Sequence, residues 1–172
     1  MSQKMIVLTF AATGHVLGAV TRAGQPETLP KPVDIVGDGL LVRDPDTGQL
    51  EIHVAPERLS SVLVDRADHV LVNPKTYAIE NGLVEEQPAL PADPLTLDGT
   101  SIDIDVGAAV SEDTDVWVQI ESDALLNPLI RLLQIPESDQ KVSEALTLPA
   151  GDYSALVMIP SFRTEIRKKT IT

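Results

Sequence analysis

The chain has 172 residues, and its 26 Asp and Glu residues against 13 Lys and Arg residues give a formal net charge of −13. We therefore do not expect it to bind nucleic acid or an anionic membrane surface, because either partner requires a cationic footprint. It contains no cysteine and only five aromatic residues, which excludes disulfides, thiolate metal sites and cysteine nucleophiles and disfavours a base-stacking or sugar-stacking platform.

The composition predicts an all-β fold. Val, Ile and Thr together make up 43 of the 172 residues, and β-branched residues favour strands over helices. The 13 Pro and 10 Gly residues are scattered along the chain, as is typical of many short strands joined by turns. We expect at most one or two short helices.

The N-terminal half predicts a series of short strands. Apolar runs at 5–11 and 15–22 flank a Thr-Gly turn signal and predict a hairpin. A second hairpin is predicted from the runs at 40–43 and 50–54, which flank a turn containing Pro and Gly. A proline opens one predicted helical turn at 56–60. Further short strands are predicted at 33–36, 62–64, 70–72 and 76–80.

The first apolar run also has the outline of a secretory signal, since Lys4 precedes a mostly apolar stretch. Thr9, Thr13 and His15 interrupt that stretch, so we do not expect secretion by an N-terminal signal. No apolar run is long enough to span a membrane. The expected location is the cytoplasm or a virion or similar particle.

The segment 87–94 marks the predicted boundary between two domains. It carries three prolines in eight residues, which stiffen a connection without forming a core. We expect a strand-rich N-terminal domain over 1–86, with a sandwich or barrel-like arrangement. Residues 95–172 are expected to form an immunoglobulin-like β-sandwich.

The C-terminal part again predicts strands, at 95–97, 101–106 and 116–121. In the second of these, Ile102 and Ile104 alternate with acidic residues and should share one face. The exception is 128–134, where an apolar stripe after Asn127 predicts a helix. A hairpin between 145–148 and 153–159 and a last strand over 162–171 complete the prediction.

The sequence from Leu148 to Tyr153, Leu-Pro-Ala-Gly-Asp-Tyr, resembles the penultimate turn of many immunoglobulin-like and carboxypeptidase-regulatory-like β-sandwiches. The resemblance covers about 15 residues, so it implies a sandwich architecture and no particular family.

The sequence contains few candidate catalytic or ligand-binding residues. His15, His53 and His69 show no metal-binding spacing and are interpreted as structural. Neither a nucleophile elbow nor a glycine-rich phosphate loop is present in the sequence. We expect no cofactor. Oxygen ligands suited to calcium are concentrated in one region, and the candidate ligands are Asp98, Asp103, Asp105, Asp113 and Asp115.

The distribution of charge is the most informative feature. The 55 residues between Lys75 and Arg131 contain no basic residue and twelve acidic ones, whereas the last ten residues carry four cations and one acid. Such opposite charges predict a contact between one copy of the chain and the next. The predicted interface residues are Glu112, Asp113, Asp115, Phe162, Arg163, Arg167, Lys168 and Lys169.

These features predict a non-enzymatic structural or interaction subunit. The expected partner is protein, in a homo-oligomer or a larger multimeric particle, and phage-tail-like or contractile-injection-type assemblies are the nearest analogy. Two alternatives remain open at this point. One is a sandwich module that binds calcium, a glycan or a peptide through acidic loops, and the other is a carboxylate-dependent hydrolase.

Overall fold

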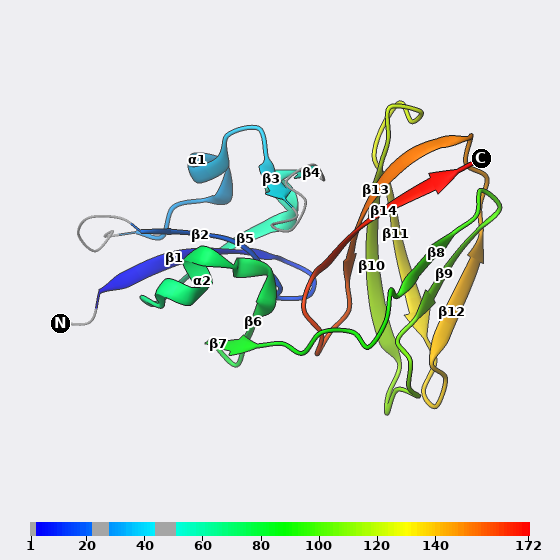
Figure 1. The fold of residues 1–172 in the computed structure, drawn as a ribbon. Helices are drawn as coiled ribbons and strands as arrows, with labels where there is room; N and C mark the ends of the chain where they lie inside the picture. Colours follow the sequence, from blue (N-terminus) through cyan, green and yellow to red (C-terminus); the bar gives the residue numbers. More distant parts are fainter. Residues whose placement is uncertain (1–2, 22–27, 44–50) are drawn as a thin grey trace. The chain divides into compact units, whose positions relative to one another are not determined.

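The computed structural model describes residues 3–21, 28–43 and 51–172. Within these ranges the chain forms fourteen strands, and its two α-helices have five residues each (Figure 1). The predicted all-β fold is therefore confirmed. The chain divides into two compact units, Met1–Pro88 and Ala89–Thr172. None of the helices in the described ranges has the length and apolar character needed to cross a membrane.

The first unit contains a three-stranded antiparallel sheet in the order β2-β1-β5. Its strands are β1 (Lys4–Phe10), β2 (Val16–Thr21) and β5 (Leu59–Asp65). The predicted β1–β2 hairpin is confirmed, and Gly14 N donates a hydrogen bond of 2.8 Å to Phe10 O in its turn. Gly14 has φ +74°, and a Cβ atom there would lie 2.9 Å from the carbonyl oxygen of Ile79, so the turn requires glycine. The core of this unit includes Met5, Val7, Val16, Val64 and Val70.

Two further hairpins belong to the first unit. They are β3 (Leu40–Arg43) with β4 (Glu51–Val54), and β6 (Tyr77–Glu80) with β7 (Leu83–Glu86). The strands of the first were predicted, while its turn lies outside the described residues. Asn81 and Gly82 form the turn of the second with φ +52° and +81°, a pair of positive values that matches the twist of the flanking strands. The described strands of this unit thus pair in three separate sheets.

Two strands predicted in the first unit are wrong, because the chain is helical there. Residues 33–36 lie in α1 (Pro32–Val36), where proline occupies the first turn and the Asp34 carboxylate accepts a hydrogen bond of 3.2 Å from Lys31 N. Residues 70–72 lie in α2 (Asp68–Val72). Apolar runs of this length do not distinguish a period of two from a period of 3.6. The predicted helical turn is confirmed as η1 (Pro56–Arg58), and η2 (Pro74–Thr76) precedes β6.

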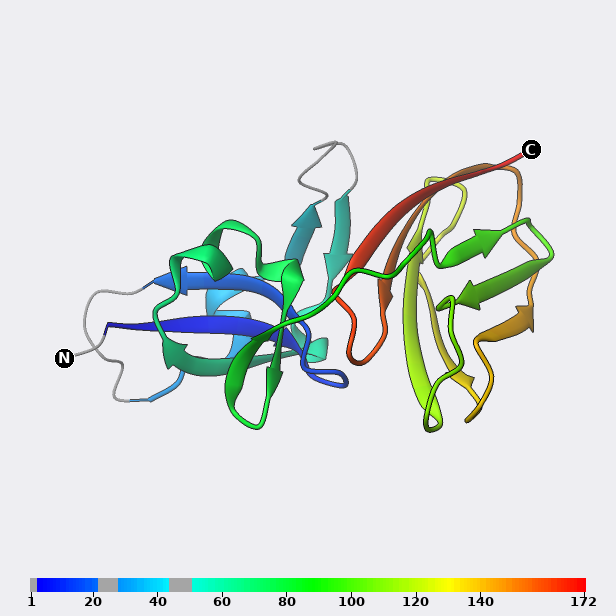
Figure 2. The ribbon, with the colours of Figure 1, turned by 60° about the horizontal axis from the view of Figure 1, so that its bottom comes forward.

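The second unit is a sandwich of two antiparallel sheets, and Figures 1 and 2 show these sheets face to face. The four-stranded sheet has the order β11-β10-β13-β14, and the three-stranded sheet has the order β12-β9-β8. This is an immunoglobulin-like arrangement. The strands are β8 (Leu95–Leu97), β9 (Ser101–Asp105), β10 (Thr114–Glu121), β11 (Leu129–Ile135), β12 (Lys141–Ala145), β13 (Gly151–Met158) and β14 (Glu165–Ile171).

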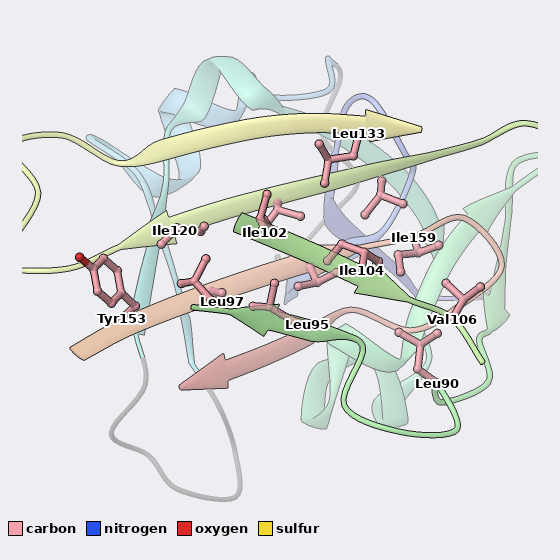
Figure 3. Packing of buried hydrophobic residues seen from close by; sticks show 14 of the residues in the cluster. Leu90, Leu95, Leu97, Ile102, Ile104, Val106, Ile120, Leu133, Tyr153 and Ile159 are labelled. Atoms are coloured by element: carbon pink, nitrogen blue, oxygen red, sulfur yellow. The ribbon is translucent and has the colours of Figure 1, made fainter. Parts of the chain in front are cut away.

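The core of the sandwich follows the alternation of the strands. Ile102 and Ile104 are fully buried and point toward the opposite sheet, where Ile120 and Tyr153 lie (Figure 3). The residues between the two isoleucines and after them are acidic and point the other way. The sequence pattern of β9 therefore predicts its orientation correctly.

Tyr153 joins the two sheets at the corner between β12 and β13. Its ring is 1% exposed, and its hydroxyl group donates a hydrogen bond of 2.5 Å to Pro149 O, four residues earlier. This is the tyrosine corner of immunoglobulin-like sandwiches. The predicted hairpin between 145–148 and 153–159 is consequently wrong, since β12 pairs with β9 and β13 pairs with β10 and β14.

The helix predicted at 128–134 is also wrong. These residues form β11, which pairs with β10 over seven residues and places Leu132 opposite Trp117. Leu133 and Ile135 are buried while Leu132 and Gln134 are exposed, which is a period of two. A helix of seven residues is marginal by itself, and pairing with β10 satisfies the same backbone groups and buries apolar surface.

Most residues of the proline-rich segment 87–94 belong to one of the two units. Gln87 belongs to the first, because its backbone N donates to Thr76 O at 2.8 Å and its side chain donates to Glu80 at 2.8 Å. Leu90 is buried in the core of the sandwich, and Pro94 O accepts a hydrogen bond of 2.9 Å from β9. Between Gln87 and Leu90 only two exposed residues remain.

We expect Tyr153→Phe to lower the free energy of unfolding of the second unit by about 1 kcal/mol, because the variant loses one neutral hydrogen bond. Trp117 on β10 is the only tryptophan, so its fluorescence during urea unfolding reports on this unit. Tyr77→Phe in the first unit is the matched control, since no hydrogen bond to that hydroxyl group is found in the described structure. A Tyr153→Phe transition that coincides with the wild-type transition would contradict the role of the corner.

Candidate functional site

The three histidines show no catalytic or metal-binding arrangement within the described ranges. His15 is 1% exposed, and its Nδ1 lies 2.7 Å from Thr13 Oγ1 inside the first hairpin turn. The ring of His69 lies 5.1 Å from the ring of Tyr77. No group of three or more His, Cys, Asp or Glu side chains in the described part of the chain is placed to hold a metal ion.

Asp98 shapes the turn between β8 and β9. Its Oδ1 accepts hydrogen bonds from Thr100 N at 2.9 Å, from Ser101 N at 2.8 Å and from Thr100 Oγ1 at 2.9 Å. The backbone donors hold the pKa of this carboxyl below its ordinary value of 3.8, and the hydroxyl donor adds to the effect. Asp98 is therefore committed to the turn.

The other four predicted calcium ligands also accept hydrogen bonds, two of them from nearby residues and two from residues distant in the sequence. Asp103 Oδ2 accepts from Ser101 Oγ at 2.7 Å, and Asp105 Oδ1 accepts from Gly107 N at 2.8 Å, both on the outer face of the three-stranded sheet. Asp115 Oδ1, on β10 of the other sheet, accepts from Gln134 at 3.3 Å, and Asp113 Oδ1, on the β9–β10 connection, accepts from Glu137 N at 2.9 Å. Each of the five carboxylates is therefore used as a hydrogen-bond acceptor, and no three of them are placed to share a metal ion within the described ranges.

Exposed carboxylates gather at one end of the sandwich, on the β9–β10 and β11–β12 connections and the start of β10. Backbone hydrogen bonds join the two connections, from Val110 N to Asp139 O at 2.8 Å and from Ser138 N to Val110 O at 2.9 Å. We call this surface the acidic loop end. It consists of Glu112, Asp113, Asp115, Glu137 and Asp139, all exposed.

Three of these residues, Glu112, Asp113 and Asp115, were predicted as interface residues, and the structure brings them together. Glu137 and Asp139 were missed, because they follow Arg131 and so lie beyond the segment without basic residues. The hydrogen bonds between the two connections reveal the proximity, and no pattern in the sequence indicates it.

The cationic C-terminal residues lie on and beside a strand of the sandwich. β14 pairs with β13 over seven residues, and Ile171 is buried in the core. Phe162 packs against the same core. We call Arg163, Arg167, Lys168 and Lys169 the cationic strip.

Each cation of the strip has an acidic partner within the second unit. Glu165, whose side chain is 5% exposed, lies between Arg163 at 3.0 Å and Arg167 at 2.8 Å. Asp93 contacts Lys169 at 2.5 Å and Arg167 at 3.4 Å, and Asp152 contacts Lys168 at 3.2 Å. The acidic loop end has no comparable ion pair within the described ranges.

A groove of about 420 Å³ lies in the first unit, between the end of β5, the start of α2 and the β6–β7 turn. Two carboxylates line it, those of Asp65 and Glu85. Asp65 forms an ion pair with Lys4, another lining residue, at 2.9 Å. The groove therefore shows no free pair of carboxylates of the kind a hydrolase requires.

No known protein-family model matches this chain, and no curated protein sequence matches it significantly. The residues and their geometry are thus the basis for assigning a function.

We expect the Asp98 turn to make the second unit sensitive to acid. The pKa of the Asp98 carboxyl is lower in the folded state than in the unfolded state. The carboxylate therefore stabilises the folded state fully above the unfolded pKa, and this stabilisation is lost as the pH falls through the folded pKa. Asp98→Asn should be less stable than wild type at neutral pH, and the difference should shrink below about pH 4.

Urea unfolding followed by Trp117 fluorescence across that range measures the difference in midpoint. The control is Asp123→Asn, an exposed carboxylate without a hydrogen bond in the described structure, which should follow the wild-type curve. A difference between Asp98→Asn and wild type that stays constant with pH would contradict the assignment.

Proposed function

We propose that the protein is a non-enzymatic interaction subunit that assembles with further copies of itself through the acidic loop end. The observation that carries the proposal is the exposure of five carboxylates on two joined connections and the start of β10, without an ion-pair partner in the described part of the chain. Like charges held close together repel one another. A cationic surface of another molecule relieves that repulsion.

The location of these carboxylates also supports binding. Loops at the ends of a sandwich are held by the sheets and carry the binding residues of many such domains. Complementary charge steers association and selects the orientation of the partner. Because the acidic loop end and the surface that receives it are different patches, the contact is heterologous and repeats as a ring or a stack. A subunit of a phage-tail-like or contractile-injection-type particle would have this property.

No specific observation favours the two alternatives. The predicted calcium ligands are used in separate hydrogen bonds, and the carboxylate of Asp65 in the groove is paired with Lys4. Both alternatives need ligand groups that converge and are free to act.

Light scattering after size-exclusion chromatography tests the assembly. We expect the wild type to exceed the monomer mass at low salt and to dissociate at high salt, because salt screens exposed charges. The triple variant Glu112→Gln, Glu137→Gln and Asp139→Asn should remain monomeric. It retains every side-chain hydrogen bond described above for Asp113 and Asp115.

The control variant is Asp38→Asn, Glu57→Gln and Asp123→Asn, which removes the same charge from other exposed positions and should assemble like the wild type. A wild-type monomer at high concentration in low salt would refute the proposal. Truncation of 163–172 is unsuitable for this test, because it removes β14 from the sandwich.

A further inference from the structure

We infer that the cationic strip is the surface that receives the acidic loop end of a second copy, and that Asp93 and Asp152 mask this strip in the free chain. The inference rests on the proposed function and adds to it the receiving surface and its regulation. It follows from the positions of the cations, from the difference between their acidic partners, and from charge complementarity.

The cations lie along an edge of the sandwich. β14 is the edge strand of the four-stranded sheet, β8 is the edge strand of the other sheet, and the two strands are in contact. Arg167 and Lys169 pair in register with Ala155 and Tyr153, so they lie on the face of β14 that turns toward the other sheet. Lys168 lies on the opposite face. The strip therefore offers positive charge on both sides of one exposed strand edge.

The acidic partners fall into two groups. Glu165 is almost fully buried between two arginines, and its removal would leave Arg163 without this ion pair and Arg167 with Asp93 alone. Asp93 and Asp152 have side chains that are 48% and 60% exposed. Exposed ion pairs contribute little net stability because water and salt compete for them. A set of carboxylates from another molecule can displace Asp93 and Asp152, whereas Glu165 stays in place.

The acidic loop end supplies such a set. Its five carboxylates lie on two joined connections and the start of β10, so one docking event presents several of them at once. The two aspartates of the mask must then leave their cations, which keeps the affinity between free copies low. Asp152 is also held by the Thr170 hydroxyl, which donates a hydrogen bond of 2.6 Å to its Oδ1.

The experiment uses the full chain and the double variant Asp93→Asn and Asp152→Asn. Each asparagine keeps the side-chain oxygen that accepts the bonds from Leu95 N and Thr170 Oγ1, so the local geometry is retained. The probe is a short fluorescein-labelled polyglutamate peptide, and its binding is followed by fluorescence anisotropy at low salt. We expect the double variant to bind the peptide about tenfold more tightly than the wild type.

The matched control is Asp38→Asn with Glu144→Gln, because Asp38 is exposed and belongs to neither charged surface. It removes the same net charge and also frees Arg131, which pairs with Glu144 at 2.7 Å on the opposite edge of the sandwich. We expect its affinity for the peptide to stay within about twofold of the wild type, because neither substitution removes an acidic partner of the cationic strip. Adding Lys168→Gln and Lys169→Gln to the double variant should return binding to the wild-type level.

If the double variant and the control bind the peptide with equal affinity, the inference that Asp93 and Asp152 mask the strip is overturned. The single variant Asp152→Asn, whose ion pair is the more exposed, gives the same test if the double variant does not fold, and it should bind more tightly than wild type. Light scattering of the same samples separates the two proposals. A double variant that binds the peptide but stays monomeric supports the mask and refutes assembly through the acidic loop end.

Discussion

Burial of apolar side chains between the two sheets of the second unit is the constraint on which its other features depend. Ile102 and Ile104 must face Ile120 and Tyr153, so the residues next to the two isoleucines face outward. The same requirement keeps β14 in the sandwich through Ile171 and thereby places four cations on and beside an edge strand. The packing of the core therefore determines where the charged residues of this unit lie on its surface.

The edges of the sandwich show how the fold accommodates charge near that core. At one edge Arg131 of β11 pairs with Glu144 of β12, and at the other Asp93 pairs with cations of β14. The Arg131–Glu144 pair connects the two sheets, and the pairs of Asp93 connect β14 with the segment that precedes β8. Charged side chains at an edge also discourage unwanted strand pairing. A contact that exchanges Asp93 for the carboxylates of another copy would use an existing ion-pair site, with Glu165 left in place.

Much of the fold could be predicted from local patterns. The alternation of Ile102 and Ile104 with acidic residues, the first hairpin and the turn before Tyr153 all depend on neighbours in the chain. The wrong predictions concern elements whose structure depends on residues distant in the sequence. The apolar residues of β11 fit a helix as well as a strand, and pairing with β10 decided between them. Likewise, β12 and β13 flank a turn but join different sheets.

For the candidate surfaces, the sequence by itself determined the signs of the charges and where along the chain they concentrate. Only the tertiary structure decided which charges are free. It brought Glu137 and Asp139 to the predicted acids, used the predicted calcium ligands as hydrogen-bond acceptors, and gave each cation of the strip an acidic partner. The physical reason is that charge is a property of each residue, whereas neutralisation requires two groups within a few ångströms, and residues as distant as Asp93 and Lys169 meet only after the sheets have packed.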